Sequence, residues 1–376
     1  MFRPFLLTAL FFFPVAAIAA PINTDAKQAI ILDFETGIVL FEKDARRPMP
    51  PASMTKIMTA FMVFEALERG DITEDTTFRV SEDAWRRGGV ASGSSTMFLD
   101  VNSEVSVIDL LRGVIIQSGN DACIVLAEGL AGSESAFADR MTERAREMGL
   151  ETATFRNATG WPDEDHEISA LDLAQLTRKL IERFPQYYGI YSERSFTWNG
   201  IEQNNRNPLL GRVAGADGVK TGSTTVSGYG VVGSAQRDGD RIITVINGLD
   251  SAGDRRRVAA EIMETAFRDF DVIDLYSAGE TLGDVPTYMG KSESVPTVLR
   301  EDAIVAFARR DRDNVAARIE YTVAPAPIAA GDKVAELVVT NDNDELARYP
   351  LYATEAVERK GFMGRAMASL LQKIRG

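Results

Sequence analysis

Apolar and polar positions over roughly the first 270 residues predict strands at both ends of a unit and helices between them. Apolar runs at 28–34 and 38–42 flank the turn Glu35-Thr36-Gly37, which is a hairpin signal. Helical spacing covers most of 104–184, with a loop at about 151–168. Further strands and a closing helix are expected at 195–198, 213–223, 228–236, 241–249 and 254–270. This order predicts an α/β (α+β) fold, in which helices flank an antiparallel sheet and add a helical subdomain.

The pattern changes at about residue 272, where helical spacing disappears. Short β-rich runs follow, separated by turn residues, at 295–299, 303–308, 316–322, 333–340 and 345–351. We therefore expect a first domain at 20–271 and a small β-rich domain at 272–356. The second domain shows no catalytic constellation, and we interpret it as a spacer or a docking surface.

The two ends of the chain differ from both domains. Arg3, the apolar run 5–18 and the small residues Ala17 and Ala19 are typical of a signal peptide at 1–19. The alternative, a membrane-spanning anchor, is disfavoured because the apolar run is too short. At the other end, 357–376 combines basic residues with an apolar helical face, which indicates an amphipathic helix on a membrane surface. A helix packed on the β-rich domain is the alternative.

Composition excludes some classes of partner but says less about the chemistry of the site. A formal net charge of −14 argues against nucleic acid. The single cysteine, Cys123, cannot form an internal disulfide, and we interpret it as a buried apolar residue. The single histidine, His166, follows three acidic residues, so a Ser-His-acid triad is possible, although a solvated loop is the simpler interpretation. No pattern indicates a metal site, and no cofactor is expected.

Three short motifs occur in one order along the chain: Ser53-x-x-Lys56, Ser118-x-Asn120 and Lys220-Thr221-Gly222. Together they describe a serine acyl-transfer site whose base is a lysine. Apolar helix formers follow Ser53, so this residue is expected in the first turn of a helix, with Lys56 one turn further on. A serine hydroxyl needs a nearby base, and Lys56 serves only when neutral, a state that burial and the second cation Lys220 would favour.

The other two motifs supply a proton relay and recognition. Ser118 would relay a proton, while Asn120 would bind the substrate amide and Lys56. The third motif ends a strand that is expected at a sheet edge, where an extended peptide can pair with it. Lys220 and Thr221 would hold an anionic end of the substrate. Gly222 would allow close approach, and the N–H of Ser223 would help Ser53 N–H to bind an oxyanion. Each motif alone has a simpler explanation, such as a helix cap at Ser118, and only the combination favours catalysis.

The chain resembles the D-alanyl-D-alanine carboxypeptidases, the low-molecular-mass penicillin-binding proteins related to β-lactamases. The matching stretches are Pro51–Thr59, Gly93–Leu99, Gly113–Ala122, Asn205–Asn207 and Asp217–Gly222. The resemblance implies Ser53 as nucleophile, Lys56 as base, Ser118 as relay and Lys220 as carboxylate binder. It also implies peptidoglycan stem peptides as substrates, β-lactams as inhibitors, and a place at the periplasmic face of the inner membrane.

Two departures from that family concern substrate binding. Thr159 stands where some relatives have a histidine, and the strand 241–249 ends at Asp250 where some relatives soon have an arginine. The group that helps Lys220 to hold the terminal carboxylate is therefore open, with Arg206 favoured over Arg255.

Three functions are compatible with these motifs. The favoured one is removal of the terminal D-Ala from stem pentapeptides. A β-lactamase would need a carboxylate to activate water, and Glu164 and Glu167 lie in the right loop without the usual pattern. A non-catalytic wall-binding protein with a vestigial site is the third.

Overall fold

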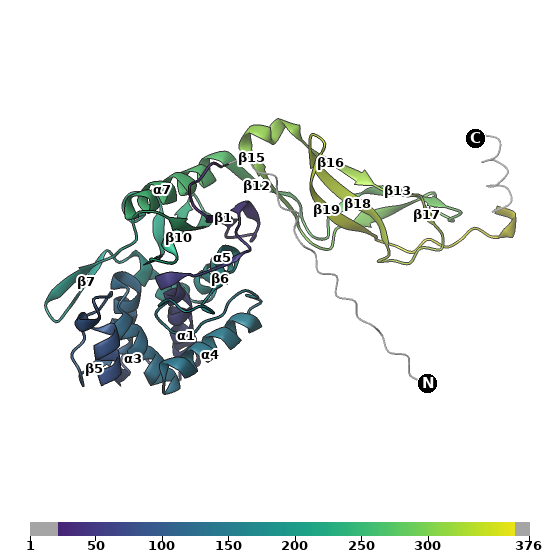
Figure 1. The fold of residues 1–376 in the computed structure, drawn as a ribbon. Coiled ribbons are helices and arrows are strands. Elements are labelled where there is room, and N and C mark those ends of the chain that lie inside the picture. The colour runs from purple at the N-terminus through teal and green to yellow at the C-terminus, as the bar shows by residue number, and fades with distance from the viewer. Residues whose placement is uncertain (1–21, 365–376) are drawn as a thin grey trace, which may run out of the picture. The chain divides into compact units, whose positions relative to one another are not determined.

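The computed structural model describes residues 22–364, which divide between Arg268 and Asp269 into two compact units (Figure 1). The predicted signal peptide 1–19 lies outside the described residues, as does most of the predicted tail helix, from 365 onward. The first unit contains all three motifs that predict catalysis, so it is named the catalytic unit below. The described residues from 269 onward are named the β unit.

A five-stranded antiparallel sheet forms the centre of the catalytic unit, in the order β2-β1-β11-β10-β9. Its strands are β1 (Gln28–Asp33), β2 (Val39–Lys43), β9 (Ala216–Thr224), β10 (Gly228–Arg237) and β11 (Asp240–Leu249). The predicted hairpin is confirmed as β1 and β2. The strand that ends in the third motif is β9, and it lies at the sheet edge as expected.

Helices cover both faces of this sheet (Figure 1), because strands from both ends of the unit expose an apolar surface on each side. On one face lies α7 (Ala252–Asp269), whose Met263 and Ala266 are buried. On the other lies α5 (Ala170–Arg183), which packs against β1 and β11. Beyond α5 the remaining helices form the predicted helical subdomain: α1 (Lys56–Arg69), α2 (Val107–Arg112), α3 (Asn120–Ala131), α4 (Glu134–Glu147) and the short α6 (Pro185–Tyr188).

Three short strand pairs join the loops of this unit: β3 (Pro48–Met49) with β6 (Ile168–Ser169), β4 (Thr77–Arg79) with β5 (Glu104–Ser106), and β7 (Ser195–Trp198) with β8 (Ile201–Asn204). Most of its buried apolar side chains belong to one core, in which most residues of α1 and α3 are buried. Lys56 on α1 and Asn120 on α3 are therefore held by helices of this core.

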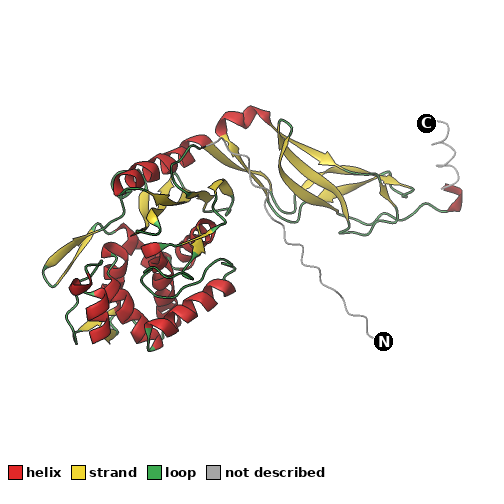
Figure 2. Ribbon diagram, viewed as in Figure 1, coloured by secondary structure: helices red, strands yellow, loops and turns green. Residues whose placement is uncertain are grey.

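The β unit is built mainly from strands, with one 3-10 turn at Arg309–Asn314 (Figure 2). A two-stranded pair joins β12 (Phe270–Tyr276) to β15 (Ala303–Ala308). A six-stranded sheet contains β16 (Val315–Glu320), β18 (Lys333–Asn341), β19 (Asp344–Ala353), β14 (Ser294–Val298), β13 (Thr281–Tyr288) and β17 (Ala324–Pro325), in that order. The sequence pattern missed β12, β13 and the two-residue β17 of this unit, and the short β3, β4, β5, β6 and β8 of the catalytic unit.

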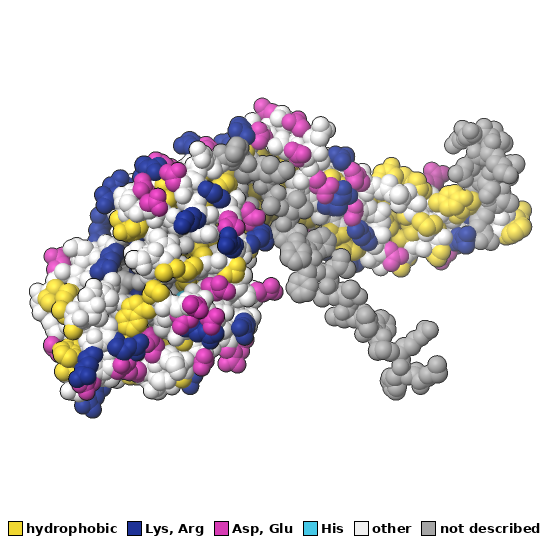
Figure 3. Space-filling view, viewed as in Figure 1, with side chains coloured by type: hydrophobic (Ala, Val, Ile, Leu, Met, Phe, Trp, Pro, Cys, Tyr) yellow, Lys and Arg dark blue, Asp and Glu magenta, His cyan; other side chains and the backbone are white. Residues whose placement is uncertain are grey.

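The surface carries both signs of charge. Figure 3 shows Lys and Arg side chains interspersed with Asp and Glu on the face in view. The excess of acidic residues therefore forms no single patch on that face.

Candidate active site

Ser53 lies in a 3-10 turn, Ala52–Thr55, which runs directly into α1. Residues three apart eclipse one another in a 3-10 turn, so Ser53 and Lys56 face the same way. The distance from Lys56 Nζ to Ser53 Oγ is 3.1 Å. The expectation that Ser53 belongs to the α-helix itself is thus corrected to a 3-10 turn before it, while the expected pairing of the two side chains is present.

The amine of Lys56 is completely enclosed, with a relative exposure of 1%. Besides Ser53, it contacts Asn120 Oδ1 at 2.7 Å and the carbonyl oxygen of Thr159 at 2.6 Å. Both of these oxygens only accept hydrogen bonds. A neutral amine has two hydrogens and one lone pair, so the two acceptors occupy the hydrogens and leave the lone pair for the Ser53 hydroxyl. The geometry therefore suits a lysine base.

The surroundings of Lys56 shift its amine towards the neutral form. Burial lowers the pKa of Lys56 to about 8, and the positive charge of Arg206 contributes to the lowering. Lys220, which we expected to be the second cation, also interacts with Lys56, and the positive charge of each amine disfavours protonation of the other. The cost of desolvating an ammonium group is the main reason for the shift.

The middle motif opens α3 but does not cap it. Gly119 is the N-cap residue and no side chain closes the cap, so the helix-cap explanation of Ser118 is wrong. Ser118 itself adopts a left-handed backbone, with φ of 67°. Its Oγ is buried and has no hydrogen-bond partner within residues 22–364. Asn120 is oriented by a bond from its Nδ2 to Ser94 Oγ at 3.0 Å, which directs its Oδ1 to Lys56.

The third motif packs against the turn that carries the serine. A Cβ added to Gly222 would lie 2.7 Å from the carbonyl oxygen of Pro51, so this glycine brings β9 close to the Ser53 turn. Close packing within the protein is thus a second reason for a glycine here, and close approach of a substrate stays a prediction. Lys220 and Thr221 are buried, and Ser223 is exposed at the strand's end.

Further positive groups accompany Lys220 at this edge. Burial lowers the pKa of Lys220 well below its ordinary value, and the charges of Lys56 and Arg206 add to the effect. Arg206 donates to Ser95 Oγ at 2.6 Å, while the guanidinium of Arg255 lies 3.4 Å from the carbonyl oxygen of Gly222. Arg255, from α7, is therefore in contact with the motif, whereas Arg206 reaches it through its field.

A loop that sequence reasoning treated as solvated completes the site. Its Thr159 uses a backbone carbonyl to bind Lys56, so the identity of the side chain at this position does not decide the contact. Asn157 Oδ1 accepts N–H groups of Thr159, Gly160 and Trp161, which shapes the turn. His166 is 3% exposed, which contradicts the expected solvated position. Turn chemistry around Asn157 was the only signal that could have indicated this.

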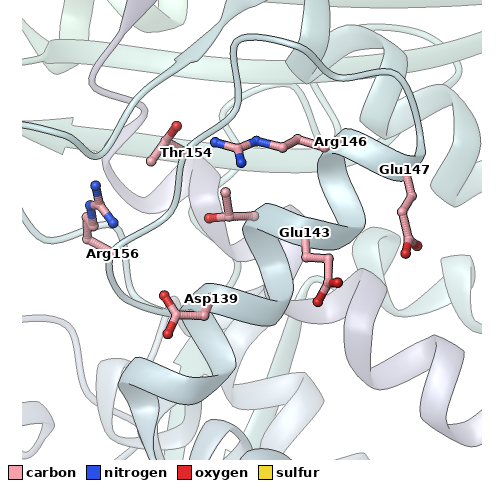
Figure 4. A pocket seen from close by; sticks show the side chains of 7 residues that line it. Asp139, Glu143, Arg146, Glu147, Thr154 and Arg156 are labelled. Carbon is pink, nitrogen blue, oxygen red and sulfur yellow. The ribbon is translucent and has the colours of Figure 1, made fainter.

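The same loop is also attached to the helical subdomain. Figure 4 shows Thr154 and Arg156 on the loop across from Asp139, Glu143 and Arg146 on α4. Thr142, also on α4, exchanges hydrogen bonds with the backbone of Phe155: its Oγ1 accepts from the amide at 2.9 Å and donates to the carbonyl at 3.2 Å. The loop is thus clamped on its outer side by α4.

Other candidates stay apart. Within the described part, no hydrogen bond joins Ser118 or Ser223 to Ser53 or Lys56. Cys123 is buried in α3 as expected, and burial raises the pKa of its thiol to about 12. Residues 22–364 contain no group of three or more metal-ligating side chains, and no helix there is long and apolar enough to cross a membrane.

The arrangement of a serine beside an enclosed lysine amine, with a Lys-Thr-Gly edge strand packed on its turn, is that of a serine acyl-transferase. Family comparison gives the particular group. Residues 15–251 match the D-alanyl-D-alanine carboxypeptidase family, and 270–359 match the C-terminal domain of penicillin-binding protein 5. The chain belongs to this family and is a serine-type D-alanyl-D-alanine carboxypeptidase.

Individual relatives agree over nearly the whole chain. D-alanyl-D-alanine carboxypeptidase DacC of Escherichia coli is 35% identical, with 98% of this chain and 93% of that protein covered. DacD of Salmonella typhimurium is 33% identical, with 92% and 90% covered.

Solved structures share the fold. The crystal structure of DacD from Francisella tularensis gives a TM-score of 0.85 at 28% identity, covering 95% of this chain and all of that one. Penicillin-binding protein 5 of Haemophilus influenzae gives 0.76 at 32% identity, covering 91% of this chain and 100% of that one. Penicillin-binding protein D2 of Listeria monocytogenes, in an ampicillin-bound form, gives a TM-score of 0.57 at 29% identity. The match covers 66% of this chain and 99% of that one.

Proposed function

We propose that this carboxypeptidase removes the terminal D-Ala from peptidoglycan stem pentapeptides through an acyl-enzyme on Ser53. The observation that carries the proposal is the Lys56 amine, whose two acceptors, Asn120 and Thr159, leave its lone pair for Ser53 Oγ. No other residue is needed as base.

Acylation begins when Lys56 Nζ takes the hydroxyl proton of Ser53 and Oγ bonds to the carbonyl carbon of the penultimate D-Ala. The oxyanion so formed is held by the N–H groups of Ser53 and Ser223. The C–N bond to the terminal D-Ala then breaks, and Ser118 relays the proton from Lys56 to the leaving amine. The buried, unpartnered Oγ of Ser118 suits a relay, since no other bond competes for it. Water then attacks the acyl carbon and loses a proton to Lys56. The ester bond to Ser53 Oγ breaks, Lys56 returns the proton to Oγ, and the shortened peptide leaves as a carboxylic acid.

Recognition of a free carboxylate falls to Lys220 and Thr221, with Arg206 or Arg255 beside them. The lowered pKa of Lys220 makes it sensitive to an arriving anion, because a carboxylate stabilises the protonated amine. The second cation that binds the carboxylate is either Arg206 or Arg255, which contacts Gly222.

We further propose that the protein is exported and acts at the periplasmic face of the inner membrane, held by the tail helix. This rests on the sequence patterns at 1–19 and 357–376. Phe362 and Met363, which are 81% and 85% exposed, begin the apolar face of that tail.

The test is intact-mass measurement after incubation with penicillin, followed by mass spectrometry of pentapeptide products. One adduct on the wild-type chain, absent from Ser53→Ala, is expected together with release of one D-Ala. Labelling that survives in Ser53→Ala would overturn the nucleophile. Rapid loss of the adduct with hydrolysed penicillin would favour a β-lactamase, and no adduct at all would favour a vestigial site.

A β-lactamase finds little support in the loop carboxylates. Glu164 is exposed, and Glu167 pairs through its backbone with Thr154. Neither side chain is a partner of Lys56.

A further inference from the structure

The carbonyl oxygen of Thr159 orients the base, so whatever holds its loop also governs the reaction. This loop, residues 152–168, is named the base loop below. A backbone carbonyl has no rotamer of its own, and its position is set by the ties between the loop and its neighbours. Two ties lie next to Thr159: Thr59 Oγ1 donates to the carbonyl of Ala158 at 2.7 Å, and Ala158 N–H donates to Glu134 Oε1 at 3.1 Å.

His166 supplies a third tie, which joins both halves of the base loop to the first turn before α1. Its Nε2 lies 2.8 Å from Thr55 Oγ1, and its Nδ1 lies 3.1 Å from the backbone N of Arg156. Thr55 is completely buried and stands between Ser53 and Lys56 in sequence. The imidazole therefore connects the base loop to the turn that presents the nucleophile.

The contacts of the ring determine its tautomer. A backbone N–H only donates, so Nδ1 must accept the bond from Arg156 and cannot carry a proton. The proton of the neutral ring is consequently on Nε2 and points to Thr55. A charged ring would place a second N–H against the N–H of Arg156 and lose that bond. Both nitrogens are occupied, so His166 is not free to take a proton from Ser53.

We propose that His166 is a positioning residue for acylation, whose neutral ring fixes the base loop to Thr55 so that the Thr159 carbonyl keeps the Lys56 amine directed at Ser53. This inference rests on the proposed function. It assigns a role to the only histidine of the chain without making it a catalytic acid or base.

The surroundings keep the ring neutral. Burial lowers the pKa of His166 to about 4. The titratable and charged groups that act on the ring are Asp163, which raises the pKa, and Arg156 and Lys56, which lower it. Phe155 packs edge-on against the ring at a centroid distance of 5.6 Å and adds to its enclosure.

A direct test reads the ring itself, independently of activity. Because the chain has one histidine, its ¹⁵N and ¹H imidazole signals are unambiguous. We expect the Nε2–H form and no titration near the ordinary His pKa of about 6.5. Titration near that value, or a proton on Nδ1, would overturn the proposal whether or not the protein hydrolyses peptides.

The functional test is a double-mutant cycle on the rate of acylation by penicillin. His166→Ala and Thr55→Val should each slow acylation by about 10- to 100-fold, and the double variant should be no slower than the worse single, because both remove one tie. His166→Gln, whose side-chain amide can still donate to Thr55, should recover part of the rate. Thr177→Val is the matched control, since it removes a buried hydroxyl bond within α5 and leaves the base loop intact.

A pH profile separates positioning from a loss of stability. Loosening the base loop lets water reach Lys56, so the acidic limb of the acylation rate should move to higher pH in His166→Ala and Thr55→Val and stay unchanged in Thr177→Val. Additive effects in the double variant, or an unmoved limb in a folded Thr55→Val protein, would overturn the proposal. A wild-type chain that penicillin does not acylate would instead overturn the proposed function. The imidazole spectrum would still show the tautomer and the titration of the His166 ring.

Discussion

The two units bury polar groups in opposite ways. The catalytic unit encloses Lys56, Lys220, Asn120, Asp121 and His166, each at 4% exposure or less. In the described part of the β unit the buried polar residues are two threonines, Thr297 and Thr340, and every charged residue is at least partly exposed. Arg348, for example, bridges Glu320, Glu336 and Glu345 in a partly exposed cluster.

This difference indicates which unit contains the functional site. Burying a charged group costs free energy unless partners compensate it, so a unit that does so repeatedly is organised around a site. In the catalytic unit the partners are present: Asp121 alone accepts bonds from Thr96, Met97, Leu99 and Ala122. The β unit follows the ordinary rule of an apolar interior under a charged surface, which suits a spacer or a docking surface.

The largest effect is expected from the buried base. Lys56→Arg keeps a cation but cannot supply a neutral amine, so acylation by penicillin should fall by roughly 10³-fold or more. Intact-mass kinetics measure this, with circular dichroism to confirm the fold. Normal acylation in this variant would show that Lys56 is not the base, and the burial of its amine would then need another reason.

A smaller loss is expected from the recognition cation. Lys220→Gln should lower kcat/KM for a peptide with a free terminal carboxylate by about 10²-fold, the usual cost of breaking a buried charge pair. In the wild-type protein, the C-terminal amide of the same peptide should be a poor substrate. In the variant, the difference between acid and amide should largely vanish.

Arg206→Gln and Arg255→Gln are the matched controls, because each removes one cation from the same region. The arginine whose loss also narrows the difference between acid and amide is the second carboxylate ligand. Equal kcat/KM for acid and amide in the wild-type protein would contradict carboxylate recognition.

The pH dependence follows from the lowered pKa of Lys56, about 8. The base is active when neutral, so the acylation rate should rise about tenfold per pH unit below that value and level off above it. A thioester without a carboxylate separates this limb from the titration of Lys220. A rate that rises only near the ordinary lysine value of about 10.4 would contradict the burial effect.

The sequence predicts site contacts made by side chains better than it predicts those made by backbone atoms. The roles proposed for Ser53, Lys56, Ser118, Asn120 and Lys220 belong to their side chains within three short motifs, so the sequence marked these residues as candidates. Thr159 acts through its carbonyl, which leaves no trace in residue type. The ties of His166 to Thr55 and of Glu134 to Ala158 join distant segments, and no local pattern predicts such contacts.

The missed elements have local causes. Gly283 and Pro286 interrupt the pattern of β13, although the strand tolerates both. Strand β12 begins at Phe270, directly after α7, so its first residue was assigned to the helix. The positions of Ser53 before α1 and of Ser118 before α3 reflect boundary errors of the same kind.

Damage confined to the β unit should leave acylation unchanged. Leu351 is completely buried in β19, and Leu351→Ala should cost about 2–5 kcal/mol of that unit's stability. Calorimetry should show one transition at lower temperature, while the penicillin acylation rate at 25 °C stays within experimental error. A large loss of acylation in the folded variant would contradict the separation of the two units.

The smallest effect on catalysis, and a large one on location, is expected from the tail. Removing residues 359–376 should release the mature protein from anionic vesicles and leave hydrolysis of a soluble peptide unchanged, because no residue of the proposed site lies in the tail. Binding has an apolar contribution, from Met363, Met367, Leu370 and Ile374, and an electrostatic one from the basic residues. Added salt should weaken the second and not the first. Leu370→Asp should therefore reduce vesicle binding even at low salt, whereas a truncated protein that binds vesicles as well as the full chain would show that the tail is not the anchor.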